Sequence, residues 1–243
     1  MKNWNGKRYW IVGASAGLGR EVARQVSQMG AEVILSARNE DELNALAAEL
    51  PGKSQVVPMD IASDESVAAA AEAAGHVDGL VFLAGVYWSF GSAAWEAERA
   101  VKMIDINLTG AFRVLGHVVP EMVARDSGHI VFTGSLSGFR GLPKAVGYGA
   151  SKAGLMSLAE TMNADLRKTG VQVQLINPGF VKTRLTDKND YKMPFLMEPG
   201  YAAREYVEHM GTDRFAKNYP TLFSSAIRFT QFLPDWLYYR LFG

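Results

Sequence analysis

Tyr148 and Lys152 are the residues of this sequence that point most directly to proton transfer. They lie four residues apart at the start of a long helical pattern, a spacing that places both side chains on one face of a helix, one turn apart. A phenol ordinarily has a pKa near 10, which is too high for efficient proton transfer at neutral pH, and a nearby ammonium would stabilise the phenolate and lower that pKa. Because such pairs are also common on helix surfaces, the pair needs partners before it predicts catalysis.

Two polar residues elsewhere in the chain are candidate partners for this pair. Ser135 follows an apolar run, so its hydroxyl is expected at the carboxyl edge of a parallel sheet, where ligands bind in open α/β folds. Asn107 lies inside a helical pattern, where an asparagine is mildly unfavourable and tends to have another role; a surface asparagine on a long helix is the alternative. We therefore take Asn107, Ser135, Tyr148 and Lys152 as candidate catalytic residues.

A glycine-rich turn near the start of the chain predicts a dinucleotide site. The segment Gly13-Ala14-Ser15-Ala16-Gly17-Leu18-Gly19 directly follows the first apolar run and opens the first helical pattern. Glycines there would let a phosphate approach the free N–H groups at a helix N-terminus, which favours anions. Glycine-rich turns also occur for steric reasons alone, but a strand before and a helix after favour nucleotide binding. We expect Gly13, Ser15, Gly17, Leu18 and Gly19 to contact the cofactor.

Arg38, at the end of the second apolar run, predicts which dinucleotide binds. A carboxylate at this position would bind the adenosine ribose hydroxyls, whereas a guanidinium can fork onto a 2′-phosphate. A solvated arginine after a strand is the alternative. We expect NADP(H) to be preferred, with NAD(H) as the second choice.

Further cofactor contacts are expected where later apolar runs end. Asp60 and Ile61 follow the third run, although Asp60 suits a helix-flanking turn nearly as well. Ala84 and Gly85 offer a bend of small residues after the fourth run. The sixth run closes in a rigid turn whose backbone, with the Thr183 hydroxyl, could hold a carboxamide. Its expected contacts are Pro178, Gly179, Val181 and Thr183.

The elements that must position these residues alternate between short apolar runs and longer amphipathic ones. This pattern predicts an α/β fold, a Rossmann-like doubly wound parallel sheet of six to seven strands with helices on both faces. The expected strands are Arg8–Val12, Glu32–Ser36, Gln55–Pro58, Gly79–Leu83, His129–Thr133 and Val171–Asn177. The expected helices are Gly17–Met29, Glu40–Leu50, Asp64–Ala74, Ala94–Arg125, Gly147–Thr169 and Gly200–Met210.

Composition narrows the class of protein. The 243 residues suit one domain, with 184–243 expected to form a substrate lid and an aromatic C-terminal segment. Lysine plus arginine and aspartate plus glutamate both total 25, which gives no basic surface for nucleic acid. No cysteine is present and the four histidines are scattered, so we expect no metal site. No apolar stretch suits a signal peptide or a membrane span, and a cytoplasmic location is expected.

Taken together, these residues resemble the short-chain dehydrogenase/reductase family of the compact single-domain kind. The resemblance covers roughly residues 5 to 185 and rests on the glycine turn, Asp60, Asn107, Ser135, Tyr148, Lys152 and Pro178-Gly179 at family-like spacing. It implies that Tyr148 is the general acid/base and that Ser135 orients the substrate oxygen. It also implies that Lys152 lowers the pKa of Tyr148 and holds the nicotinamide ribose, and that Asn107 holds a water in a proton relay.

Three departures from the family pattern stand out. Val12 replaces the threonine that usually precedes the first glycine. The usual Asn-Asn-Ala-Gly after the fourth strand reads Phe82-Leu83-Ala84-Gly85, which removes side-chain amide contacts. The usual ending, a seventh strand that finishes in Asp-Gly-Gly, is missing from the sequence pattern.

The function expected from these features is NADP(H)-dependent hydride transfer between the nicotinamide and a carbonyl or secondary alcohol substrate. A non-catalytic dinucleotide-binding regulator or redox sensor is the alternative, and a nucleotide-sugar epimerase is a third. Large apolar residues in loops after the strands or in the lid predict an apolar substrate pocket, with ordinary core packing as the alternative for any of them: Tyr87, Trp88, Phe90, Phe139, Met193 and Phe195. The family resemblance implies a homodimer or homotetramer. The aromatic segment 227–242, which suits two short helices broken at Pro234, is expected to pack on the domain or a partner subunit, or else to lie on a membrane or beside a lipophilic substrate.

Overall fold

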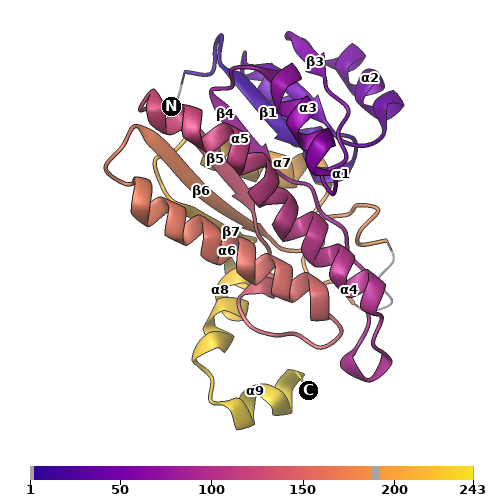
Figure 1. The fold of residues 1–243 in the computed structure, drawn as a ribbon. Helices are drawn as coiled ribbons and strands as arrows, with labels where there is room; N and C mark the ends of the chain where they lie inside the picture. Colours follow the sequence, from indigo (N-terminus) through magenta and orange to yellow (C-terminus); the bar gives the residue numbers. More distant parts are fainter. Residues whose placement is uncertain (1–2, 188–191, 243) are drawn as a thin grey trace.

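The computed structural model describes residues 3–187 and 192–242, which form one seven-stranded, fully parallel sheet between two layers of helices (Figure 1). The strands are β1 (Arg8–Val12), β2 (Glu32–Ser36), β3 (Ser54–Val56), β4 (Gly79–Phe82), β5 (Gly128–Thr133), β6 (Val171–Pro178) and β7 (Ala216–Tyr219). Their order is β3-β2-β1-β4-β5-β6-β7, and each pair of neighbours is parallel. The six predicted strands are all present, and the predicted doubly wound α/β class is confirmed.

The sheet has a seventh strand, as the predicted range of six to seven allows, although no apolar run in the sequence marked its position. The segment Ala216–Tyr219 pairs with β6 along Leu175–Pro178. Its sequence, Ala-Lys-Asn-Tyr, is polar because β7 is the edge strand and only Tyr219 of its four residues is buried. An apolar run, the signal that found the other strands, is therefore absent here. The strand leads into Pro220 rather than into Asp-Gly-Gly.

The helices follow the predicted pattern, with one division. They are α1 (Gly17–Gln28), α2 (Glu40–Glu49), α3 (Asp64–Ala74), α4 (Ala97–Ile104), α5 (Gly110–Ala124), α6 (Val146–Leu166), α7 (Pro199–Met210), α8 (Thr221–Phe229) and α9 (Asp235–Phe242). Short 3₁₀ turns cover Ser92–Ala94, Leu136–Gly138 and Thr230–Phe232. The single helix predicted over Ala94–Arg125 is instead α4 and α5 joined by a π-helical turn, Asp105–Thr109.

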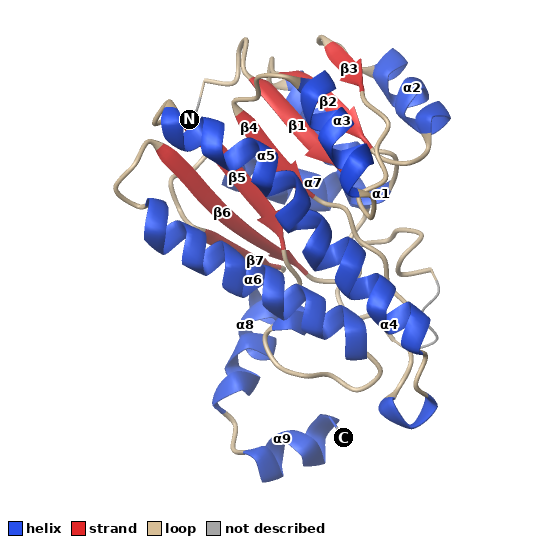
Figure 2. Cartoon of the chain, viewed as in Figure 1, coloured by secondary structure: helices blue, strands red, loops and turns tan. Residues whose placement is uncertain are grey.

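The two helix layers bury opposite faces of the sheet (Figure 2). Side chains alternate along each strand, so Trp10 and Val12 pack under α3, α5 and α6, whereas Tyr9 and Ile11 pack under α1, α2 and α7. Helix α7 belongs to the second layer, where Ala202, Ala203 and Tyr206 are fully buried. Because every strand runs the same way, the carboxyl ends of all strands lie along one edge.

The last two helices leave this sandwich. Helix α8 starts beside β7, and α9 lies beyond the carboxyl edge of the sheet, apart from the strands (Figure 1). A proline, Pro234, separates them, as the sequence predicts for two short aromatic helices. No helix within residues 3–187 and 192–242 is both long and apolar enough to cross a membrane.

Candidate active site

A cavity of about 860 Å³ opens at the carboxyl edge of the sheet and is lined by nearly all the predicted site residues. Those that line it are Gly13, Ser15, Gly17, Leu18, Gly19, Arg38, Asp60, Ile61, Ala84, Gly85, Ser135, Tyr148, Lys152, Pro178, Gly179, Val181 and Thr183. They come from the ends of β1 to β6 and the start of α6, which parallel strands bring to one place. Asn107 is the one predicted catalytic or cofactor-binding residue that does not line the cavity.

The glycine turn has the shape of a phosphate cradle. A Cβ atom on Gly13 would lie 2.6 Å from the backbone nitrogen of Ala84, and one on Gly19 would lie 2.0 Å from the carbonyl oxygen of Gly13. Gly17 adopts a φ of +54° and faces Thr183, whose methyl group would be 2.8 Å from a Cβ atom. No side chain caps the N-terminus of α1 and its first turn carries no acid, so that helix end faces the cavity without a counter-charge.

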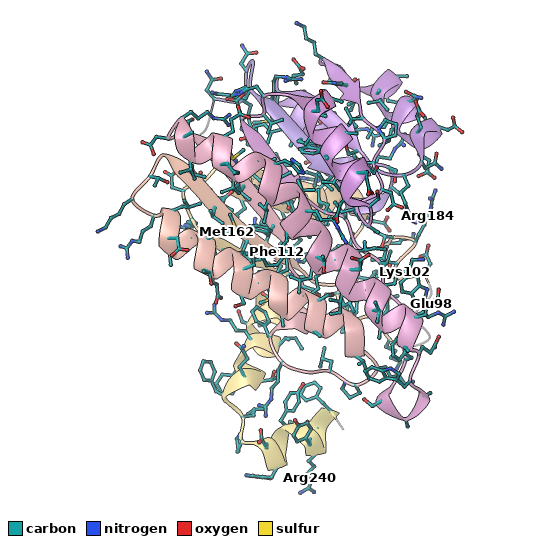
Figure 3. The ribbon with its side chains drawn as sticks, viewed as in Figure 1. Glu98, Lys102, Phe112, Met162, Arg184 and Arg240 are labelled. Atoms are coloured by element: carbon teal, nitrogen blue, oxygen red, sulfur yellow. The ribbon has the colours of Figure 1, made fainter. Side chains whose placement is uncertain are left out.

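The cavity end near α2 holds the expected cofactor-selecting arginine. Arg38 is exposed and lines the cavity. Glu42 in α2 also lines it and forms an ion pair of 2.8 Å with Arg184. Arg184 follows β6 and is labelled in Figure 3. The Asp60 carboxylate accepts a 3.0 Å hydrogen bond from the backbone N–H of Ala62. This bond is the one expected if Asp60 is a turn residue, the alternative interpretation. Asp60 also lines the cavity, so its side chain can face a ligand as well.

Tyr148, Ser135 and Ser137 form the polar centre of the cavity. The Ser135 hydroxyl forms a hydrogen bond with the Tyr148 phenol, and its oxygen accepts from the Ser137 hydroxyl at 2.9 Å and the Ser137 N–H at 3.2 Å. Because the Ser135 oxygen accepts twice within its own loop, its own proton is available to Tyr148 or to a ligand. Ser137 was not singled out from the sequence. Its spacing from Ser135, two residues on in a serine-rich turn, was the only available signal.

The phenol and the ammonium do not pair as the sequence suggested. Burial raises the pKa of Tyr148 to about 12, and the hydrogen bond from Ser135 only partly offsets this effect. Burial lowers the pKa of Lys152 to about 8. The Lys152 ammonium donates a 2.7 Å hydrogen bond to the carbonyl oxygen of Thr133 and lies 5.8 Å from the centroid of the Tyr148 ring. In the protein alone, the expected lowering of the Tyr148 pKa by Lys152 is therefore absent.

Asn107 lies in the π-helical turn and is fully buried, so the alternative of a surface asparagine was wrong. Its Nδ2 donates to the carbonyl oxygen of Val86 and to the Ser151 hydroxyl, both at 3.0 Å. Its Oδ1 accepts a 2.7 Å hydrogen bond from the Val86 N–H. Both amide protons have acceptors, so a water at this residue would have to bind an oxygen. The side chain fixes the loop after β4 that carries Gly85 and Tyr87.

Only part of the predicted aromatic wall surrounds the cavity. Tyr87 lines it and meets the Tyr148 ring edge to face at 5.0 Å. Phe90 instead packs on Ala100 and Met103, and Phe139 packs against the core beneath the sheet. Trp88, Met193 and Phe195 do not line the cavity either. Apolar residues that the sequence interpretation missed do so: Leu142, Phe180, Leu185, Phe223 and Ile227. Phe223 and Ile227 are four residues apart in α8, a helical spacing that could have identified them.

No group of three or more metal-ligating side chains occurs in the part of the chain that the structure describes. The polar groups of the site are the glycine turn 13–19, the exposed Arg38, the hydroxyls of Ser135 and Ser137, the buried phenol of Tyr148 and the buried ammonium of Lys152.

Comparison with known proteins identifies the family. The model of the short-chain dehydrogenase family matches residues 7–193. The chain belongs to that family. An oxidoreductase of Myxococcus xanthus (strain DK1622) is 40% identical over 208 residues, which cover 83% of this chain and 81% of the relative.

Solved structures share the fold of this short-chain dehydrogenase. One from Burkholderia phymatum, in complex with NAD, has a TM-score of 0.86 at 24% identity and covers 94% of each chain. One from Sphingobium yanoikuyae, in complex with NADPH, has a TM-score of 0.82 at 24% identity and covers 94% of this chain and 97% of its own. These likenesses establish the fold, and the two proteins differ from each other in the dinucleotide they bind.

Proposed function

We propose that this oxidoreductase binds NADP(H) in the cavity and transfers hydride between the nicotinamide and a carbonyl or secondary alcohol substrate. The observation that carries the proposal is the convergence of the glycine cradle, Arg38, Ser135, Tyr148 and Lys152 on one cavity. The cradle fits a dinucleotide because its glycines leave the space that a Cβ atom would fill, and because α1 presents an uncapped N-terminus to it. When bound, the dinucleotide would supply or accept the hydride.

The residues of the chain would handle the proton and the substrate oxygen. With a pKa of about 12, Tyr148 is protonated at neutral pH and can donate to a carbonyl oxygen as it gains negative charge. The Ser135 hydroxyl, whose oxygen accepts from Ser137, donates to the same substrate oxygen and polarises the carbonyl. Lys152 would hold the ribose hydroxyls from the floor of the cavity, and Asn107 would stabilise the loop that faces it. In the reverse direction Tyr148 must lose its proton, which additional positive charge at the site would favour.

The substrate is proposed to be apolar. Tyr87, Leu142, Phe223 and Ile227 lie around the cavity without formal charge, and the lid predicted within 184–243 would contribute through Leu185 and α8. A homodimer or homotetramer and a cytoplasmic location stay predictions.

The first test is the titration of NADPH and NADH by fluorescence against the wild type, Arg38→Gln and Arg167→Gln. Arg167 is a matched exposed arginine at the end of α6, outside the cavity. We expect tighter binding of NADPH than NADH, lost in Arg38→Gln and kept in Arg167→Gln. Equal or tighter NADH binding would contradict the choice of NADP(H). Absence of binding of either dinucleotide would contradict the proposal as a whole.

The chemical step is tested by Tyr148→Phe with NADPH and a panel of apolar ketones. Loss of the general acid should reduce kcat by about 10²- to 10⁴-fold while NADPH affinity is retained. Dinucleotide binding without turnover of any ketone by the wild type would favour the regulator alternative.

A further inference from the structure

Residues 221–242, called the arm below, present a row of large apolar side chains to solvent. Six are exposed: Leu222, Phe229, Phe232, Trp236, Tyr239 and Leu241. In α8, Leu222, Ala226 and Phe229 are exposed and follow the i, i+4, i+7 spacing of one helical face. Phe232 and Trp236 are 77% and 69% exposed, values far above those of a residue packed on its own domain. Six large exposed apolar side chains within 22 residues, with the rings of Phe229 and Phe232 6.3 Å apart, point to an interaction surface.

Polar contacts hold the arm to the rest of the domain. Its apolar side chains are therefore exposed even though the arm is attached. The Arg140 guanidinium donates 2.7 Å hydrogen bonds to the carbonyl oxygens of Thr230 and Leu233 and pairs with Asp235 at 2.6 Å. It also lies 3.9 Å from the centroid of the Tyr238 ring, whose hydroxyl donates to the Gly141 carbonyl at 2.6 Å. These contacts determine which side of the arm faces outward.

The charges of the arm indicate the kind of surface it fits. Asp235 is its one acidic residue within 221–242, and Arg140 pairs with it. Arg228 and Arg240 are exposed, and Figure 3 shows Arg240 on the far side of α9 from the sheet. Aromatic rings beside arginines suit the boundary between lipid headgroups and acyl chains, with the arginines drawn to anionic headgroups. Two copies of the arm facing each other would instead bring four arginines together with no free acid to pair them.

The inner side of the arm reaches the active-site cavity. Phe223 and Ile227 lie in α8, the helix that exposes Leu222 and Phe229, and both line the cavity. The same two turns of helix thus form an outer apolar surface and an inner apolar wall. A surface on which the arm rests would lie next to the cavity.

We propose that the arm docks this protein on a membrane surface that contains anionic lipid, with the rings of Phe229, Phe232, Trp236 and Tyr239 in the headgroup region. Helices of eight and nine residues are too short to span a bilayer, so the contact is peripheral. If the proposed function holds, on which this consequence rests, the substrate is a carbonyl or alcohol that partitions into lipid and enters past α8.

The test is flotation with vesicles of phosphatidylcholine alone and of phosphatidylcholine mixed with phosphatidylglycerol. The wild type is compared with the pair Phe232→Ser/Trp236→Ser and with the control pair Phe112→Ser/Trp95→Ser. Phe112 and Trp95 are 53% and 59% exposed and lie outside the arm. A third variant, Arg228→Gln/Arg240→Gln, tests the charge. Circular dichroism and NADPH titration accompany each protein.

We expect the wild type and the control pair to float with the anionic vesicles, and the bound fraction of the arm pair to fall at least tenfold. The arginine variant should bind the anionic vesicles less than the wild type does, and its binding to phosphatidylcholine alone should equal that of the wild type. A wild type that stays unbound to both vesicle types would overturn the proposal. A second result would also overturn it: no vesicle binding by the wild type, together with a change of oligomeric state in the Phe232→Ser/Trp236→Ser variant, measured by light scattering. The arm would then cover another copy of the chain. If the wild type binds vesicles but does not bind NADPH, the proposed function is contradicted and the membrane proposal is supported.

Discussion

The ammonium of Lys152 donates its 2.7 Å hydrogen bond to the carbonyl oxygen of Thr133, so it joins the helix that carries Tyr148 to the strand that leads to Ser135. Lys152 and Thr133 are both buried, and Lys152 is only 4% exposed. This bond therefore fixes the position of α6, which carries Tyr148, relative to β5, which leads to Ser135. Burial without an acidic partner is also why its pKa falls to about 8.

This burial predicts a pH dependence of stability. Below about pH 8 the amine is protonated in both the folded and the unfolded state, and the cost of burying the charge is complete. Between pH 8 and 10.5 the unfolded chain binds the proton more tightly, so this cost falls as the pH rises. Relative to Lys152→Met, the wild type should gain about 1 to 2 kcal/mol of unfolding free energy between about pH 7.5 and 9.5. Urea unfolding of both proteins measures the difference, and a pH-independent difference would show that burial does not lower the pKa of Lys152.

Ser137 predicts a positioning effect on catalysis. Its hydroxyl and N–H both donate to the Ser135 oxygen, and Ser137→Ala removes only the first. We expect kcat to fall about three- to tenfold with little change in KM, because a neutral hydrogen bond contributes about 0.5 to 1.5 kcal/mol. In a Ser135→Ala background the same substitution should have no further effect on kcat. Additive losses in the double variant would mean that Ser137 acts elsewhere.

Asn107 predicts a structural effect that can be separated from any role in a proton relay. Asn107→Ala leaves the Val86 N–H and carbonyl and the Ser151 hydroxyl without their shared partner. The free energy of unfolding should fall by about 2 to 3 kcal/mol. Asn107→Asp keeps an oxygen for the Val86 N–H but sets a second oxygen against the Val86 carbonyl in a buried place, so it should recover little of the stability. Urea unfolding measures both variants, and unchanged stability in Asn107→Ala would place the function of this residue in the reaction alone.

The sequence predicts well those features that depend on local pattern. Apolar residues in or beside the first six strands mark their positions, and the cavity residues follow from where those strands end, because parallel strands share a carboxyl edge. Strand β7 was missed because an edge strand with Lys217 and Asn218 buries little and needs no such run. The π-helical turn at Asn107 was missed because its extra residue per turn is stabilised by contacts with Val86 and Ser151, which are distant in sequence.

The pKa of Tyr148 shows a different limit. The Tyr-x-x-x-Lys spacing correctly predicts one helix face, but it does not reveal that the lysine is directed to Thr133 or that both groups are buried. Burial then raises the pKa of Tyr148, and the lowering expected from the Lys152 ammonium is not seen. The aromatic wall shows the same limit, since Phe90 and Phe139 turned to the core while Phe223 and Ile227 of α8 reached the cavity.

The ion pair between Glu42 and Arg184 predicts a second influence on dinucleotide choice. Both residues line the cavity with Arg38, and their 2.8 Å contact neutralises a carboxylate on the side where a 2′-phosphate would bind. Arg184→Gln leaves that carboxylate unpaired and should weaken NADPH binding about two- to fivefold, with a smaller effect on NADH, the size expected for an exposed pair. Glu42→Gln should tighten NADPH binding by a similar factor, and the double variant should return near the wild type. Fluorescence titration at low and high salt measures all three, and the effects should shrink as salt rises. Equal changes for NADPH and NADH would show that the pair only braces the segment after β6 against α2.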